Sequence, residues 1–360
     1  MVLTSTLSLS EALERGLNLL QTRALRRAGA MVAVSTTNSV WKVRTLRAAT
    51  VLPWMCVWLF GCDAWTGGSD LRVEGATPYV RCLAYEPPAD SVKRIGGARI
   101  RTRNGAIAIE GLRAPVTMAA FSGPGFEPPA RAAIEALAAA RPQLVLMLGG
   151  IGDTPAIALS TLAALAGLPV PILILAGGRD SPGRIEHALE GLKAGAADRI
   201  TDVTASTAVS IGNDTFIPIA GSLGGHYALD AEACGYGESD LRSRAANDAM
   251  PPKSRRWLLA WDAPASDGDL AVTRAGGGLA LGNAPLGELA RALGARGGLF
   301  AWPEAQVLRP SAGGHRPATP GVPHTDLQLV VPRLSGPPIE RSDGSRVPPG
   351  FALLRLEPAG

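Results

Sequence analysis

Four carboxylates stand in loops that directly follow apolar, strand-like segments of this 360-residue chain. They are Asp153 in GGIGD, Asp180 in GGRD, Asp262 in WDAPA and Glu304 in WPEA. Ligands of α/β sheets bind beyond the carboxyl ends of the strands. One interpretation is therefore that the four carboxylates converge on a divalent metal ion, because carboxylates alone hold hard cations such as Mg²⁺ or Ca²⁺.

His226 is the histidine with the most suggestive position. It follows AGSLGG directly after a predicted strand, and a glycine-rich loop there lets a ligand approach the backbone closely. With Asp153 and Asp180 it would form the catalytic set of a hydrolase. The alternative is a tight turn in which His226 is hydrogen-bonded to a neighbour. The remaining histidines lie on a predicted helix or beside a Gly/Pro-rich loop: His187, His315 and His324.

Arg179 and Ser181 indicate a different chemistry. An arginine at a helix N-terminus, beside free backbone N–H groups, is a reasonable site for a small anionic ligand. Asp262 and Glu304 complete the set of ligand-binding candidates. The alternative is that Arg179 pairs with Asp153 or Asp180 and neutralises that carboxylate.

The segments around these loops alternate between apolar strands and alanine-rich helices after Pro115, which is typical of an α/β sandwich or a doubly wound sheet. Asn104-Gly105 predicts a hairpin, and Thr154-Pro155 and Ser181-Pro182 predict helix starts. The predicted strands are VTMAAF, LVLML, PILIL, AVSI, TFIPIA, RWLLAW, GLFAW, LQLVV and FALLRL, with further helices over 129–140 and in LGELARALGA.

The order and spacing of the strand-end loops resemble the metallophosphoesterase family, the calcineurin-like hydrolases, from roughly Pro115 to Trp302. Strands of that family end in D-x-H, G-D-x-x-D, G-N-H-D/E, an isolated His and G-H-x-H. The resemblance implies a four-layer αββα sandwich of metallophosphoesterase type, here with an added N-terminal β-hairpin.

Asp153 and Asp180 keep acidic positions of the family pattern, but other positions hold residues that are not the expected ligands. These are Gly123, Gly125, Gly150, Gly178, Arg179, Trp261, Trp302 and Glu304. A two-metal hydrolase needs His nitrogens and carboxylates around ions about 3.5–4 Å apart. The resemblance therefore implies a member that has lost metal binding and catalysis, needs no cofactor, and acts in binding or as a structural component. The alternative is an atypical active phosphoesterase with a carboxylate-rich divalent metal site.

The N-terminal part resembles a bacterial lipoprotein signal peptide. Lys42, Arg44 and Arg47 precede an apolar run over 48–61 that ends in Leu59-Phe60-Gly61-Cys62, and this run is too short for a membrane span. The resemblance implies cleavage before Cys62, acylation of its thiol, and anchoring in the cell envelope facing the periplasm. Residues 1–30 are interpreted as a misassigned start, with a real cytoplasmic helix as the alternative.

The predicted organisation is a leader over 1–61 with the lipoprotein signal at 42–61, a tether over 62–71, and a single domain over 72–360. The net charge of +4 comes from residues 1–61, which hold seven Lys or Arg and two Asp or Glu. The remainder holds 28 basic and 29 acidic residues, which argues against a nucleic-acid partner and leaves an envelope protein or a small anionic ligand. Cys82 and Cys234 form a disulfide or remain free buried thiols, and the spacing leaves both open.

Overall fold

The computed structural model describes residues 1–8 and 79–358, apart from 194, 226, 247–253, 266–272, 275–279, 302–310, 313–315, 318–320 and 341–345. The chain divides into two compact units, Met1–Leu19 with Thr77–Gly360, and Leu20–Ala76. The second unit lies outside the described residues, and so do the candidate lipidation site Cys62 and the predicted tether. In the part that the structure describes, no helix combines the length and apolar character needed to cross a membrane.

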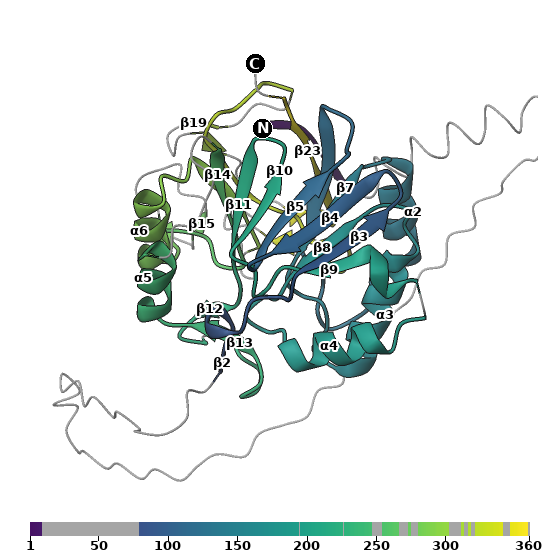
Figure 1. Ribbon diagram of the computed structural model, residues 1–360, viewed down its shortest axis with the longest axis horizontal. Helices are drawn as coiled ribbons and strands as arrows, with labels where there is room; N and C mark the ends of the chain where they lie inside the picture. The colour runs from purple at the N-terminus through teal and green to yellow at the C-terminus, as the bar shows by residue number, and fades with distance from the viewer. Residues whose placement is uncertain are drawn as a thin grey trace, which may run out of the picture. The chain divides into compact units, whose positions relative to one another are not determined.

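Two large sheets form the centre of the first unit (Figure 1). In the six-stranded sheet the order is β1 (Val2–Ser8), β23 (Gly350–Leu356), β6 (Val116–Phe121), β7 (Leu144–Leu148), β8 (Ile172–Leu175) and β9 (Ile200–Asp202). In the ten-stranded sheet it is β19 (Arg316–Pro317), β18 (Ser311–Ala312), β20 (Leu327–Val330), β17 (Gly297–Phe300), β14 (Arg255–Ala260), β11 (Asp214–Ile219), β10 (Ala208–Ile211), β5 (Ala106–Glu110), β4 (Ala98–Arg103) and β3 (Ser91–Ile95).

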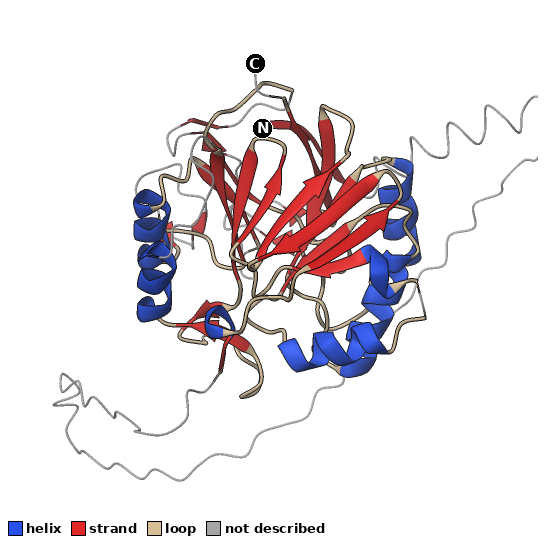
Figure 2. Cartoon of the chain, in the orientation of Figure 1, coloured by secondary structure: helices blue, strands red, loops and turns tan. Residues whose placement is uncertain are grey.

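The described helices lie in two groups on either side of these sheets (Figures 1 and 2). One group is α2 (Arg131–Ala139), α3 (Pro155–Ala166) and α4 (Pro182–Glu190), and the other is α5 (Glu238–Ala246) and α6 (Ala284–Ala292). Smaller elements are η1 (Cys82–Ala84), η2 (Ala197–Arg199), a sheet of β12 (Ser222–Leu223), β13 (Cys234–Tyr236) and β2 (Val80–Arg81), and the pairs β15 (Thr273–Arg274) with β16 (Ala280–Leu281) and β21 (Ile339–Glu340) with β22 (Arg346–Val347).

Side chains of the ten-stranded sheet alternate between two apolar cores, one on each face of the sheet. Phe216 and Trp257 belong to the larger apolar core, which also contains residues of the six-stranded sheet and of α2, α3 and α4. Their chain neighbours Ile217 and Leu258 belong to a second core with Leu286 and Leu289 of α6. Because successive side chains of a strand point to opposite faces, one face packs on the other sheet and the opposite face packs under α5 and α6. The fold is therefore an α/β sandwich, as predicted.

Local sequence signals place most of the predicted elements correctly. Asn104 and Gly105 both adopt positive φ, at 49° and 74°, in the two-residue turn between β4 and β5, as a type I′ turn requires. The side chains of Thr154 and Ser181 accept hydrogen bonds from the backbone of the first turns of α3 and α4. Both helices then begin at proline, which lacks the N–H that has no partner at this position.

The first eight residues bear on the interpretation of the N-terminus. Val2–Ser8 form β1, which pairs antiparallel with β23, and Met1 is buried. A chain cleaved before Cys62 cannot keep this strand, so a mature lipoprotein would expose the edge of β23. The leader interpretation is therefore still a prediction, and β1 is the feature of the described chain that argues against it.

Several short elements were not predicted from the sequence, and β9 and α5 are two examples. β9 has only three residues, and α5 has the sequence ESDLRSRAA with only Asp240 and Leu241 buried. Neither offers the apolar periodicity that identifies a strand or an amphipathic helix.

Candidate functional site

The carboxyl ends of the strands from both sheets meet at one place. β6, β7 and β8 run parallel, so the loops that follow them emerge at the same edge of the six-stranded sheet. Gly123 N donates to Gly149 O at 2.9 Å, and Gly221 N donates to Ala176 O at 2.9 Å. A parallel bridge between Gly177 and Gly221 joins the loop after β8 to the loop after β11 of the other sheet. We call the residues gathered here the strand-end cluster: Gly149, Asp153, Gly177, Gly178, Arg179, Asp180, Ser222 and Trp261.

Trp261 occupies the middle of the strand-end cluster. Its side chain follows β14 and is only 4% exposed. A Cβ atom added to Gly149 would stand 2.2 Å from the indole Cε3, and one added to Gly177 would stand 2.3 Å from it. The ring therefore lies in contact with the backbone at the ends of β7 and β8, which only glycine permits at this distance.

Both carboxylate oxygens of Asp180 accept hydrogen bonds from backbone N–H groups. Its Oδ2 accepts from Gly150 N at 2.9 Å and Gly177 N at 2.7 Å, and its Oδ1 accepts from Ile151 N at 2.8 Å and Gly152 N at 3.3 Å. Burial raises the pKa of this carboxyl to about 6, while the four amide donors act in the opposite direction. Asp180 thus fixes the loop after β7 against the loop after β8, and both of its oxygens are used in doing so.

Asp153 and Arg179 form an ion pair, as the charge-neutralisation alternative requires. The Asp153 side chain is 14% exposed and that of Arg179 is 33% exposed. Arg184 also contacts this ion pair's backbone. It donates to the backbone oxygen of Asp153 and to Asp230 Oδ2, the latter at 2.9 Å. The positive charge of Arg179 is therefore already matched by a carboxylate.

Asp262 belongs to a separate buried polar group. Its Oδ2 accepts from Tyr236 Oη at 2.7 Å, from Leu223 N at 2.8 Å and from Asn283 Nδ2 at 3.2 Å. Burial, followed by the nearby Asp262 charge, raises the pKa of the Tyr236 hydroxyl well above its usual value. Asn283 also caps α6 through its Oδ1. This group ties the loop after β14 to β12, β13 and α6, and the sequence analysis did not identify Tyr236 or Asn283.

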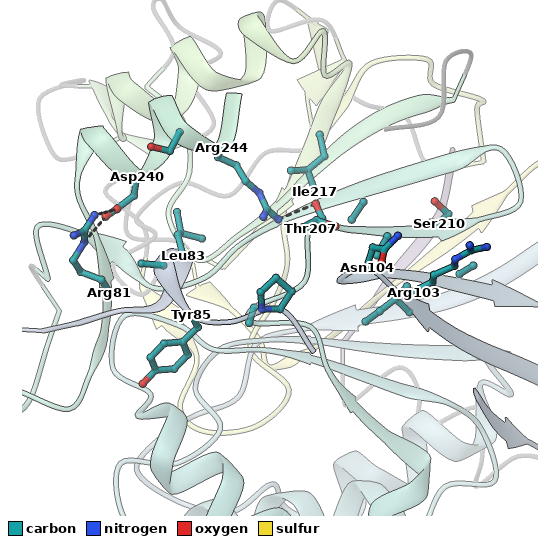
Figure 3. A pocket seen from close by; sticks show the side chains of 18 of the residues that line it. Arg81, Leu83, Tyr85, Arg103, Asn104, Thr207, Ser210, Ile217, Asp240 and Arg244 are labelled. Atoms are coloured by element: carbon teal, nitrogen blue, oxygen red, sulfur yellow. Dashed lines mark hydrogen bonds and ion pairs between the residues drawn. The ribbon is translucent and has the colours of Figure 1, made fainter. Parts of the chain in front are cut away.

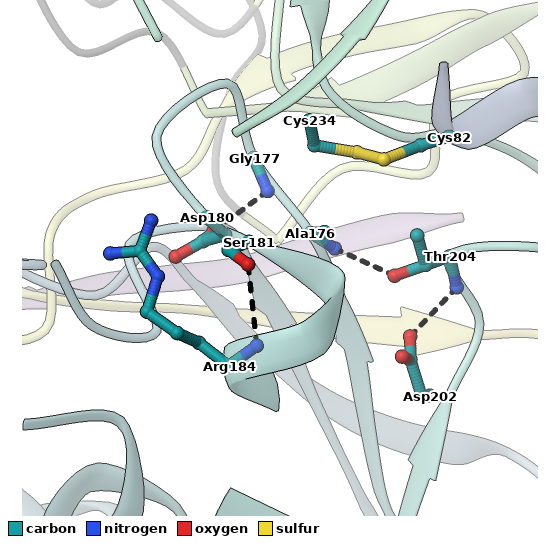
Figure 4. Close-up of a disulfide and its surroundings, with 9 residues drawn as sticks. All are labelled: Cys82, Ala176, Gly177, Asp180, Ser181, Arg184, Asp202, Thr204 and Cys234. Atoms are coloured by element: carbon teal, nitrogen blue, oxygen red, sulfur yellow. Dashed lines mark hydrogen bonds between the residues drawn. A yellow bond between two sulfur atoms is a disulfide. The ribbon is translucent and has the colours of Figure 1, made fainter. Parts of the chain in front are cut away.

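Ser181 serves the start of α4 instead of an open anion site. Its Oγ accepts from Arg184 N at 3.3 Å and lies 3.5 Å from Glu232 Oε2. Next to it, Cys82 and Cys234 form a disulfide (Figure 4). Cys82 lies in η1 and Cys234 in β13, so the disulfide links η1 to the small sheet. Cys234 N donates to the backbone oxygen of Asp180 at 2.8 Å, which places β13 beside the strand-end cluster.

Several polar atoms of the cluster are buried without a hydrogen-bond partner among the described residues. They are Asp153 Oδ1, Arg179 Nε, Ser222 Oγ and Trp261 Nε1. Ser222 Oγ and Trp261 Nε1 lie 2.5 and 3.3 Å from the point where a Cβ of Gly178 would stand. Buried polar atoms are usually hydrogen-bonded, so these four atoms make the cluster unusually polar for a buried region.

The carboxylate metal site of the first interpretation is not formed by the described residues. No three His, Cys, Asp or Glu side chains of the described chain are grouped so that they could hold a metal ion. Asp153 forms an ion pair with Arg179, and Asp180 accepts hydrogen bonds from backbone amides. Asp262 accepts a hydrogen bond from the Tyr236 hydroxyl. His226 and Glu304 lie outside the described residues, and their predicted roles are therefore untested.

Comparisons with known proteins give no family assignment. No family pattern matches the chain, and no curated protein matches it either. Two solved structures match the chain at low identity. One is a crystal structure with 13% identity, a TM-score of 0.45 and coverage of 67% of this chain and 95% of its own. The other is the crystal structure of TT1561 of Thermus thermophilus, with 12% identity, a TM-score of 0.44 and coverage of 62% of this chain and 91% of its own.

Proposed function

We propose that this protein is a lipid-anchored component of the cell envelope, in which a metallophosphoesterase-like sandwich serves binding instead of hydrolysis. The observation that carries the proposal is the position of Trp261. An active member of that family would assemble two metal ions at the strand ends, and here an indole ring lies against Gly149 and Gly177 at the ends of two of these strands. The acidic side chains that remain nearby are engaged with protein partners.

The hydrolysis part of this proposal is tested with a phosphodiester substrate. The full chain is incubated with bis(p-nitrophenyl) phosphate and Mn²⁺, Zn²⁺, Mg²⁺ or Ca²⁺ in turn, and release of p-nitrophenol is followed. We expect no turnover above that of an Asp153→Asn preparation purified in parallel, because contaminating enzymes contribute equally to both. Metal-dependent turnover that disappears in the folded Asp153→Asn variant would establish the alternative, an active phosphoesterase.

The disulfide supports the export part of the proposal. Cys82 and Cys234 are bonded across 152 residues of sequence, and such bonds persist in oxidising compartments such as the periplasm. Export through a lipoprotein signal also requires cleavage before Cys62, which removes β1 from the mature protein. The intact mass of the native protein distinguishes these states: a chain that starts at Cys62 and carries lipid is expected, and a chain that retains residues 1–61 would refute the anchor.

The anchor has a matched control within the same segment. Cys62→Ser is expected to move the protein from the membrane fraction to the soluble fraction, because it removes the acylated thiol. Cys56→Ser, six residues earlier in the apolar run, is expected to leave fractionation unchanged. Membrane association of the Cys62→Ser protein equal to that of the unmodified sequence would contradict lipidation at this residue.

A further inference from the structure

The outer face of the ten-stranded sheet is covered by helices over only part of its width. Residues of β11, β14, β17 and β20 share the second apolar core with α5 and α6. On β4 and β5, the outward positions are instead exposed or half-buried, as the alternating burial of both strands shows. A cavity of about 650 Å³ opens over these strands, between them, η1 and α5. We call it the arginine groove (Figure 3).

Small side chains form the floor of the arginine groove. Arg103 pairs with Ala106 across β4 and β5, and Ala106 pairs with Ala208 of β10. One row further along, Arg101 pairs with Ala108, and Ala108 pairs with Ser210. Each row therefore begins with an arginine and continues over small residues. Because these side chains are small, they leave open space above the strands that larger side chains would occupy.

The lining of the arginine groove carries a net positive charge. It contains four arginines and one acidic residue: Arg81, Arg101, Arg103, Arg244 and Asp240. Arg81 is paired with Asp240. Arg101 is paired with Glu110 at 2.5 Å, and this pair is exposed to solvent. Exposed ion pairs contribute little to the stability of the protein. An anion that enters the groove can therefore replace Glu110 as the partner of Arg101 at a low cost in free energy.

The other two arginines have no carboxylate partner among the described residues. The side chain of Arg103 makes no hydrogen bond or ion pair with another described residue, and Arg244 donates only to backbone oxygens, including that of Thr207 at 2.8 Å. Burial lowers the pKa of Arg244 to about 10, so it stays charged at neutral pH. Figure 3 shows Arg103 at one end of the groove, Arg81 with Asp240 at the other, and Arg244 between them.

The walls of the groove add apolar surface to this charge. Leu83 and Ile217 line it together with Tyr85, whose side chain is among the exposed large apolar residues of the protein. Small-molecule sites have volumes of about 300–1,000 Å³, mostly apolar walls and a few placed polar groups. The arginine groove meets these requirements, and no residue of the strand-end cluster lines it.

We propose that the arginine groove binds an organic anion that carries a carboxylate or phosphate head on an apolar body. The head lies against Arg103 and Arg101, where two guanidinium groups at neighbouring outward positions of one strand provide paired N–H donors. The body lies over the alanine floor toward Leu83 and Ile217. This site is separate from the strand-end cluster and does not depend on whether that cluster is catalytic.

The test uses 8-anilinonaphthalene-1-sulfonate, a fluorescent aromatic body with one anionic group. Titration of the full folded chain is expected to give saturable binding of one molecule per chain. Arg103→Glu is expected to weaken this binding at least about tenfold, which corresponds to about 1.4 kcal/mol. N-phenyl-1-naphthylamine, the same body without the sulfonate, is expected to bind more weakly and equally well to both proteins.

Two further variants make the result specific to the groove. Ala106→Phe fills the floor and is expected to abolish saturable binding without removing any charge, and it decides the matter if Arg103→Glu fails to fold. Arg131→Glu removes an arginine of α2 that is 92% exposed and is expected to leave the affinity unchanged. Urea midpoints establish that each variant is folded. Absence of saturable binding, or affinities for Arg103→Glu and Ala106→Phe equal to that of the unmodified chain, would overturn the proposal.

Discussion

The contact between Trp261 and Gly177 can be tested by a double-mutant cycle. The three atoms nearest to a Cβ added at Gly177 all belong to the indole, at 2.3, 2.7 and 2.8 Å. Gly177→Ala therefore forces the ring or the strand end to move, and overpacking of this kind costs about 1–3 kcal/mol of unfolding free energy. Trp261→Ala removes a large buried side chain, which costs about 3–5 kcal/mol.

The cycle is informative because the two changes are not expected to add. Once the indole is gone, the methyl group that Gly177→Ala introduces enters space that the ring has left. Gly177→Ala should then be neutral or stabilise by about 0.4–1 kcal/mol, since alanine restricts the unfolded chain. We therefore expect an interaction energy of about 1–3 kcal/mol between the two positions.

Gly149 provides the matched control for this cycle. It also contacts the indole, but its φ of +67° disfavours any side chain. Gly149→Ala should therefore remain destabilising in the Trp261→Ala background, through backbone strain. The assay is urea denaturation with the disulfide intact. The slope of unfolding free energy against urea concentration must be the same for all variants, so that the midpoints report stability. Additive effects of Gly177→Ala and Trp261→Ala would refute the contact on which the account of the strand-end cluster rests.

Three other changes test the buried polar groups. Arg179→Ala is expected to lower the unfolding free energy by about 1–3 kcal/mol, because it leaves Asp153 unpaired, and an unchanged melting temperature would contradict this role. Tyr236→Phe should cost about 1.5–3 kcal/mol through loss of the 2.7 Å hydrogen bond to Asp262, and thermal unfolding measures it. The pKa of Asp180 is about 6 in the folded protein and 3.8 in the unfolded chain. Because burial disfavours the ionised carboxyl, the stabilising contribution of Asp180 is fully present below pH 3.8 and is lost as the pH rises through 6. Unfolding free energies from pH 4 to 7 should therefore fall by up to about 3 kcal/mol more in the unmodified protein than in Asp180→Asn, and parallel curves would exclude this effect.

Local rules predicted the framework of the fold because the signals are local. The Asn104-Gly105 turn, the Thr154 and Ser181 caps and the apolar run Leu144–Leu148 each depend on a few adjacent residues. α5 was missed because its nine residues bury little apolar surface and its position depends on packing against other elements.

The contents of the site could be predicted only in part. The resemblance to the metallophosphoesterase family predicted that Gly178 and Trp261 replace metal ligands and that Arg179 replaces a catalytic histidine. The pairing of Arg179 with Asp153 was one of the stated alternatives. The sequence could not indicate that the indole would lie on Gly149 and Gly177, because this contact joins three strand ends through tertiary packing. The Cys82–Cys234 bond was likewise undetermined, since 152 residues of separation carry no spacing rule.

We propose that the strand ends of this sandwich do not assemble a metal pair. The most direct measurement is metal content by mass spectrometry on the purified full chain, after incubation with Mn²⁺, Zn²⁺, Mg²⁺ and Ca²⁺ and desalting. We expect no stoichiometric metal. One or two tightly held ions per chain, lost on Asp153→Asn substitution, would contradict this proposal and would make Asp153 a metal ligand.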